Sequence, residues 1–189
     1  MIKGLDETVV ASEQGGNDFS PIPKGTYFLK LVEVGAWEDS IQKNMKVIAF
    51  DDRFQKMKDA NDKDITEIVP EVHIFKNKLK FEVIEGAQAK KTFFHFVSTH
   101  PNIPWAIPNL VHAFGVPSLK LSQFKTLIGQ CIKADLDIEP SKKGKVVTDK
   151  DTGIETITYP EYTVAKRFYA LTDDESDRLT DKEENPLDI

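Results

Sequence analysis

Strict alternation of apolar and polar residues, repeated along the chain, is the feature that most constrains the fold. The clearest case is residues 131–138 (CIKADLDI), where every second residue is apolar. A period of two is what a strand with one buried face requires. Similar strand-forming stretches cover residues 26–34, 71–85, 90–98 and 156–171. The sequence therefore predicts five strands, the last one bent at Pro160.

A helical stretch separates the third strand from the fourth. Residues 107–114 and 121–128 carry apolar side chains at i, i+3 and i+4 spacing, with Gly115 and Pro117 between them. We therefore expect an all-β fold with one or two short helices. The element order fits a five-stranded OB-fold-like Greek-key barrel with a helical connection between strands 3 and 4. A two-sheet sandwich stays open, because the number of strands does not fix closure.

Residues 36–70 form a long charged insertion between the first two predicted strands. Ile41, Met45 and Ile48 recur at helical spacing, which predicts a short helix in part of it. The sequence leaves open whether the whole insertion is a helix, an extra hairpin or a mobile flap.

The charge of the chain is unevenly distributed. Residues 172–189 hold eight acids against two bases, and residues 1–20 hold four acids against one base. Since the whole chain has a net charge of −6, residues 21–171 have a net charge of +3. We expect a flexible acidic arm (1–20), one domain (21–171) and a disordered acidic tail (172–189), because so charged and apolar-poor a tail buries too little surface to order itself.

The tail has three interpretations: a solubilising segment, a docking peptide for a partner, or a mimic of a polyanion that competes for a basic groove. For docking we single out its acids and its two terminal aliphatic residues. These are Asp173, Asp174, Glu183, Glu184, Leu187, Asp188 and Ile189.

Composition excludes several classes of protein. The single cysteine, Cys131, rules out an intramolecular disulfide and a multi-cysteine metal site, and its apolar setting predicts a buried side chain. No run of 18 apolar residues predicts a membrane span, and the first residues lack the layout of a signal peptide. We expect a protein of the reducing cytoplasm.

Four short motifs resemble phage-encoded single-stranded-DNA-binding proteins. They are residues 22–27 (IPKGTY), 79–86 (LKFEVIEG), 91–94 (KTFF) and 127–130 (LIGQ). The resemblance spans roughly residues 21–170, and the insertion at 36–70 departs from the family's compact pattern. It implies an OB-fold with an acidic C-terminal tail, protection of single strands during replication or recombination, and recruitment of replication or recombination proteins by the tail, in the host cytoplasm.

Binding to a single strand needs cations for phosphates. Lys76, Lys78 and Lys80 supply them on one face of the second predicted strand, about 7 Å apart. A solvated outer face is the alternative interpretation. Two further clusters, one at the hairpin turn and one on a flexible loop tip before the last strand, complete the predicted cations. They are Lys90, Lys91, Lys142, Lys143 and Lys145.

Binding also needs flat rings for bases, although most rings of a domain this size belong to its core. The chosen residues are Trp37 in a loop-like setting, Phe54 beside Arg53, Phe94, and two tyrosines that flank Pro160, Tyr159 and Tyr162. On the third strand, Phe93, His95 and Val97 share one face, while Thr92, Phe94 and Phe96 share the other. The sequence does not say which of these two faces is buried.

Enzyme motifs are absent from the sequence. The four histidines lack HxxxH or HExxH spacing, and no phosphate-binding loop, nucleophile elbow or dinucleotide fingerprint occurs. We expect no catalysis, no cofactor and no metal. A protein-interaction or virion-assembly β-barrel module without nucleic-acid binding is the main alternative, a hydrolase or nuclease with a dispersed site is a weaker one, and homo-oligomerisation stays open.

The charge distribution generates one prediction. Deleting residues 172–189 should tighten binding to oligo-dT, most strongly at low salt, because the tail and DNA repel each other through charges that salt screens. Titration of the full-length and truncated chains at two salt concentrations measures this. Weaker binding after deletion would contradict a competing role for the tail.

Overall fold

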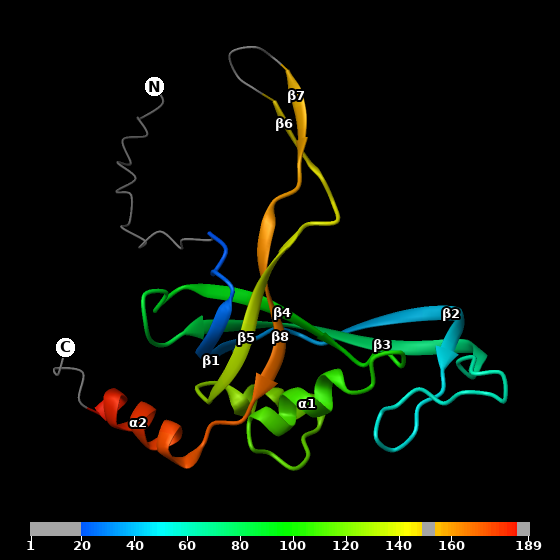
Figure 1. Cartoon of the computed structure of the whole chain (residues 1–189), viewed down its shortest axis with the longest axis horizontal. Helices are drawn as coiled ribbons and strands as arrows, with labels where there is room; N and C mark the ends of the chain where they lie inside the picture. The colour runs from blue at the N-terminus through cyan, green and yellow to red at the C-terminus, as the bar shows by residue number, and fades with distance from the viewer. Residues whose placement is uncertain (1–19, 149–153, 185–189) are drawn as a thin grey trace, which may run out of the picture.

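The computed structural model describes residues 20–148 and 154–184, and strands dominate it (Figure 1). The strands are β1 (Gly25–Val34), β2 (Glu38–Ile48), β3 (Thr66–Val83), β4 (Thr92–Ser98), β5 (Cys131–Pro140), β6 (Lys145–Thr148), β7 (Glu155–Thr158) and β8 (Glu161–Tyr169). The helices are α1 (Ala106–Ala113), the 3-10 helix η1 (Leu121–Leu127) and α2 (Asp173–Glu184). This arrangement is consistent with an OB-like all-β fold.

Five of these strands surround one core. β1 pairs with β3 and β5, β3 also pairs with β4, and β5 also pairs with β8, all antiparallel. β4 and β8 lie in contact. The helical segment of α1 and η1 falls between β4 and β5, so the predicted position of the helices is confirmed.

The core is built from alternate positions of these strands. On β3, Leu79, Phe81 and Val83 are fully buried. Phe81 is central, since its ring stacks on Phe93 with centroids 5.7 Å apart and lies 5.8 Å from the ring of Phe168 on β8. Packing of this kind fixes the register of β3, because a slip of one residue would turn every side chain to the other face.

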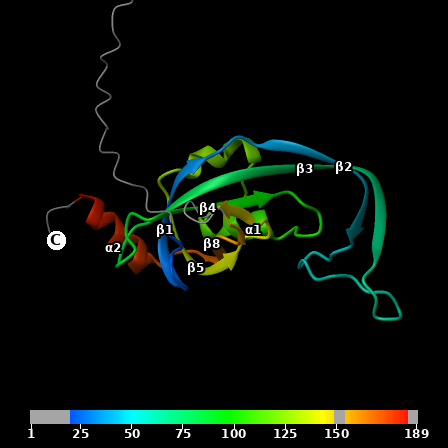
Figure 2. The same cartoon turned by 90° about the horizontal axis from the view of Figure 1, so that it is seen from above.

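Residues 36–70 form the extra hairpin and not a helix, so the helix predicted within them is wrong. β2 pairs with the first part of β3, from Glu38 opposite Lys76 to Ile48 opposite Thr66. Residues four apart, such as Ile41 and Met45, lie on one face of a strand as well as on one face of a helix. The spacing therefore fits both structures, and pairing with β3 selects the strand. We call residues 38–71 the arm, which Figure 2 shows curving away from the other strands.

The arm is tied to the segment that follows β4. The N–H of Ile48 donates to Asn102 Oδ1 at 2.7 Å, and Asn102 Nδ2 donates to the carbonyl of Lys46 at 3.1 Å. The rings of Phe50 and Trp105 meet edge to face, with centroids 5.6 Å apart. These contacts hold the far half of the arm against the segment between β4 and α1.

The predicted flexible loop before the last strand is a second hairpin, of β6 and β7. Lys142 and Lys143 precede β6 and Lys145 begins it, so these lysines lie at the base of the hairpin and the prediction that they sit on a flexible tip is wrong. Gly144 is required there, because a Cβ atom on it would lie 2.3 Å from Cγ2 of Ile157. The bend at Pro160 is confirmed, since β7 ends before it and β8 begins after it.

The acidic tail is helical over Asp173–Glu184, so the prediction of disorder is wrong for these residues. Thr172 and Glu175 form a capping box: the N–H of Thr172 donates to the Glu175 carboxylate at 3.0 Å, and the N–H of Glu175 donates to Thr172 Oγ1 at 3.3 Å. Three acids in the first turn also suit the positive end of the helix dipole. Leu179 is buried against the body of the protein.

Parts of the earlier predictions lie outside the described residues. They concern the acidic N-terminal residues 1–19 and the terminal residues Leu187, Asp188 and Ile189. Within the described residues, no helix has the length and apolar character needed to cross a membrane.

The core generates a prediction about pH. His95 lies opposite Leu79, and burial lowers the pKa of its imidazole to about 4. In the unfolded chain the pKa of His95 is near 6.5, so below this pH the unfolded chain binds a proton that the folded chain does not. The free energy of unfolding should therefore fall by about 3 kcal/mol as the pH drops from 6.5 towards 4. Denaturant unfolding across this range measures the loss.

Two variants isolate the contribution of His95. His95→Gln should flatten the pH dependence, while His112→Gln, at an exposed position of α1, should leave it unchanged. An unchanged slope in His95→Gln would show that another group causes it.

Candidate nucleic-acid interface

The outward surface of β3 and β4 gathers lysines and rings. In the antiparallel register, Lys78 lies opposite Phe96, Lys80 lies opposite Phe94, and Lys76 lies opposite Ser98. Directly opposite residues share one side of a sheet, and the neighbouring positions point into the core. We call these five side chains, Lys76, Lys78, Lys80, Phe94 and Phe96, the β3–β4 face.

The structure decides which rings of β4 are available. Phe93 and Val97 are buried, whereas Phe96 is 73% exposed. Phe94 is half-buried, because the ammonium of Lys78 lies 3.6 Å from its ring centroid and that of Lys80 lies at 6.0 Å. These are cation–π contacts. Phe96 has no such cation among the described residues, so it is the open ring of this face.

Phe96 is the residue that the predicted set of binding residues omitted. The signal was present in the sequence, because Phe96 follows Phe94 by two residues and must share its side of the strand. The sequence did not show which face of β4 is exposed, because this depends on how the core packs.

The three lysines of the β3–β4 face have room for anionic partners. None of them lies within ion-pair distance of a described carboxylate. In the strand register, Glu33 of β1 lies directly opposite Lys80 and Glu38 of β2 lies directly opposite Lys76. The three lysines therefore have rings of β4 on one side and acids of β1 and β2 on the other. Because the acids repel a polyanion, it should lie on the side of the rings.

Lys90 and Lys91 lie at the turn between β3 and β4, beyond the end of the β3–β4 face. Lys91 Nζ donates to Ser20 Oγ at 2.7 Å, and Lys90 adopts a positive φ of 69°. They are thus next to the β3–β4 face in the hairpin that β3 and β4 form.

Trp37 is anchored against η1. Its indole N–H donates to the carbonyl of Leu121 at 2.8 Å, and its ring meets the buried ring of Phe124 edge to face at 5.2 Å. These contacts fit a structural role in holding η1 to the start of the arm and do not favour base stacking by Trp37.

Arg53 and Phe54 lie in the arm's terminal loop and not on the β3–β4 face. The carboxylate of Asp51 accepts the N–H groups of Arg53 and Gln55, which shapes a turn where Phe54 has a φ of 58°. The neighbouring lysines are paired, Lys56 with Asp64 at 2.9 Å and Lys58 with Asp62 at 3.0 Å. The predicted basic-aromatic mixture is therefore partly neutralised.

Tyr159 and Tyr162 belong to a second group, at the base of the β6–β7 hairpin. Both are exposed, Tyr159 packs beside Gly144, and Tyr162 lies opposite Glu139. Together with Lys142, Lys143 and Lys145 they form the hairpin base. Apart from Trp37, the predicted residues thus fall into three places: the β3–β4 face with its turn, the hairpin base, and one pair on the arm.

The outward side of β5 has the opposite character. Hydrogen bonds from Tyr169 and Thr26 lower the pKa of Asp135, and the N–H of Ile138 and the ammonium of Lys24 lower that of Asp137. Glu139 pairs with Lys166. These carboxylates are occupied in a polar network, and within the described residues no group of three or more His, Cys, Asp or Glu side chains could hold a metal ion.

α2 docks beside β1 and β5. Lys133 Nζ lies 2.7 Å from Glu175, which lowers the pKa of that carboxyl, and Arg178 bonds Glu85 at 2.9 Å while its guanidinium lies 4.9 Å from the ring of Phe28. The acidic helix therefore does not occupy the β3–β4 face. Deleting it would also remove packing, so Asp174→Asn/Asp177→Asn tests its charge more cleanly.

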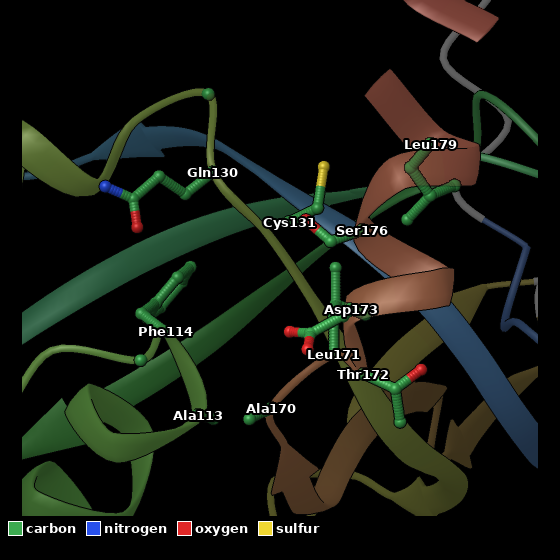
Figure 3. A pocket seen from close by; sticks show the side chains of 12 residues that line it. Ala113, Phe114, Gln130, Cys131, Ala170, Leu171, Thr172, Asp173, Ser176 and Leu179 are labelled. Carbon is green, nitrogen blue, oxygen red and sulfur yellow. The ribbon is translucent and has the colours of Figure 1, made fainter. Parts of the chain in front are cut away.

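A pocket of about 390 Å³ separates α2 from the end of α1 (Figure 3). Phe114 lies on the α1 side, Ser176 and Leu179 lie on the α2 side, and Cys131 lies between them. Of the residues that line it, Asp173 alone is charged.

Comparison with known proteins adds little. No family model matches the chain, and no curated protein matches it. A solved structure of yeast RPA bound to ssDNA is similar over 94% of this chain and 93% of its own, with 9% sequence identity and a TM-score of 0.30. A similarity of this size carries no argument about function.

Proposed function

We propose that this chain binds single-stranded DNA without sequence preference, on its β3–β4 face, and that it is not an enzyme. The observation that carries the proposal is the exposed ring of Phe96 beside Phe94 and three lysines, none of which lies within ion-pair distance of a described carboxylate. Rings accept any base because every base has a π face, and lysines accept any phosphate. Neither contact reads a sequence.

The strand pairing supports this location. We take β1, β3, β4, β5 and β8 as the five strands of a closed Greek-key barrel of the OB type. In such barrels, oligonucleotides bind the face of strands 2 and 3 and the loops between strands 1–2 and 4–5. In this chain those parts are the β3–β4 face, the arm and the β6–β7 hairpin.

The β3–β4 face suggests an order of events. Phe96 is open to a base at once, whereas Phe94 is covered by the ammonium of Lys78. A base that stacks on Phe94 displaces that ammonium, which then contacts the adjacent phosphate. The cation–π contact is thus exchanged for an ion pair, and Lys78 is held close to where the phosphate arrives.

The resemblance to phage-encoded single-stranded-DNA-binding proteins suggests the biological role. On this proposal residues 21–171 protect single strands during replication or recombination in the cytoplasm. The acidic residues 172–189 recruit replication or recombination proteins and oppose DNA binding by their charge.

Removing the open ring is the first test. Phe96→Ala should weaken binding to fluorescently labelled oligo-dT by about 1–3 kcal/mol, roughly 5- to 150-fold, measured by anisotropy, because one base loses its stacking partner. Phe96→Leu should weaken binding to a similar extent, whereas Phe96→Trp should retain binding. Anisotropy is preferred to intrinsic fluorescence because Trp37 and Trp105 are packed on other rings.

Phe96→Trp also places a reporter on the β3–β4 face. Its added fluorescence should be quenched when oligo-dT binds, because a base stacks on the indole. If oligo-dT binds and the fluorescence of this tryptophan is not quenched, the binding site does not include the β3–β4 face.

Removing one phosphate contact is the second test. Lys78→Gln should weaken binding and reduce the slope of log affinity against log salt by about 0.7, as expected for one lost contact to a single strand. Lys125→Gln, on η1, is the matched control and should change neither quantity. If the unmodified chain does not bind oligo-dT at low salt, the protein-interaction or virion-assembly module becomes the better explanation.

A further inference from the structure

One edge of the larger sheet is open at the start of the arm. β2 ends the order of that sheet, and among the described residues only β3 pairs with it. An open edge presents a row of N–H and C=O groups that can pair with a further strand. In an antiparallel pair these groups point alternately towards the partner strand and away from it, so the hydrogen bonds of β3 decide which residues of β2 are open.

Two contacts fix the direction of the β3 backbone in this region. The N–H of Phe75 donates to Thr99 Oγ1 at 2.9 Å, and the carbonyl of Phe75 accepts the N–H of Thr99 at 2.9 Å, so Phe75 points to the side of β4. The carbonyl of Lys78 accepts the N–H of Gly35 at 3.0 Å, so Lys78 points to the opposite side, where β1 and β2 lie. The even-numbered residues before Lys78 therefore point to β2 as well.

The open groups of β2 follow from its register with β3. Ser40 lies opposite Ile74 and Gln42 lies opposite Val72, so the backbone groups of Ser40 and Gln42 point to β3. The alternate residues of β2 point away from β3, to a side where no strand of the described residues pairs. These residues are Asp39, Ile41 and Lys43.

The open stretch ends at Asn44. The φ of 52° at Asn44 interrupts the extended backbone, and beyond it the direction is reversed. There the N–H of Ile48 donates to Asn102 Oδ1, and the carbonyl of Lys46 accepts from Asn102 Nδ2. Asn102 therefore covers the edge beyond Asn44, and residues 39–43 are the part that a further strand can reach.

Residues 39–43 (DSIQK) have a symmetric arrangement of charge. An acid and a base lie at equal distances on the two sides of a central isoleucine. Because side chains alternate along a strand, Asp39, Ile41 and Lys43 share one face. If a second copy of the stretch pairs antiparallel about Ile41, Asp39 of each copy lies opposite Lys43 of the other, and the two Ile41 side chains meet.

The side chains of this face are accessible. Ile41 is 51% exposed, and Asp39 and Lys43 are exposed beside it. Asp39 is held on the face by His73, whose Nδ1 lies 2.7 Å from Asp39 Oδ2. Lys43 has no carboxylate within ion-pair distance among the described residues. Asp39 of a second copy would supply one.

We propose that two copies of this chain associate through β2, paired antiparallel about a twofold axis at Ile41. The backbone groups of Asp39, Ile41 and Lys43 in one copy bond those of Lys43, Ile41 and Asp39 in the other. The same surface is used twice, so the contact closes as a dimer. The inference does not depend on the proposed function.

The charges make this edge selective. A lysine on an open edge normally protects it, because an added strand would have to place an uncharged or basic residue opposite the ammonium. Lys43 has this effect on unrelated strands, whereas a second copy of β2 places Asp39 opposite it. The paired stretch is short compared with a standard interface of about 800 Å² per partner, so the dimer should be weak.

Sedimentation velocity over a range of concentrations, without DNA, tests the association. The unmodified chain should pass from monomer to dimer as the concentration rises. Ile41→Lys should prevent this, because two ammonium groups then meet on the axis, whereas Gln55→Lys, in the loop of the arm, adds the same charge and should not. An unmodified chain that is monomeric at every concentration would overturn the inference.

Charge exchange tests the register. Asp39→Lys and Lys43→Asp should each weaken the dimer roughly tenfold or more, because like charges then face each other twice. The double variant Asp39→Lys/Lys43→Asp has the net charge of the unmodified chain and restores two opposite pairs, so it should dimerise again. If the double variant is folded by circular dichroism and remains monomeric, the antiparallel register is wrong.

A disulfide tests the position of the axis. Opposite residues that exchange hydrogen bonds have Cα atoms about 5.5 Å apart, which suits a disulfide. Ile41→Cys should therefore form a linked dimer with oxidised glutathione, above the background that Cys131 gives in the unmodified chain. In Glu38→Cys, the matched control, the two cysteines are six positions apart along the strands, about 20 Å, and should not link. Equal linkage in both variants, or none in Ile41→Cys, would contradict the pairing.

Discussion

The register of β3 between β1 and β4 is the constraint on which the rest of the structure depends. Phe81 stacks on Phe93 and lies against Phe168, so three strands are held by one buried ring. With Leu79, Phe81 and Val83 inside, Lys76, Lys78 and Lys80 must lie outside. The same alternation on β4 puts Phe94 and Phe96 beside them. The position of the candidate interface thus follows from the packing of the core.

The strands around the core carry two extensions. These differ in charge and in whether other described segments contact them. The arm is acidic and is tied back by Asn102 and by the Phe50–Trp105 contact. The β6–β7 hairpin is basic at its base and is unsupported by the described remainder of the chain. In chain order, the turn of the arm comes before the β3–β4 face and the hairpin comes after it.

The acidic tail shows how a local signal can outweigh composition. Its charge predicts disorder, yet Thr172 and Glu175 stand at the spacing of a capping box, and Leu179 falls one turn later on the same side. Lys133 of β5 then pairs with Glu175 of the tail, and Arg178 of the tail pairs with Glu85, which follows β3. The capping signal was readable in the sequence, but the surface that receives Leu179 was not, because it is formed by distant segments.

Periodicity along the chain was sufficient to predict the five strands of the core, the helical segment between β4 and β5, and the sharing of one strand face by Lys76, Lys78 and Lys80. These are local properties, since a period of two or 3.6 is written in neighbouring residues. Only the tertiary structure decided that Phe96 is open, that Trp37 is anchored on Phe124, and that residues 36–70 pair as a hairpin. Each of these depends on which residues meet across the fold, because exposure and partnership arise from contacts between segments far apart in sequence.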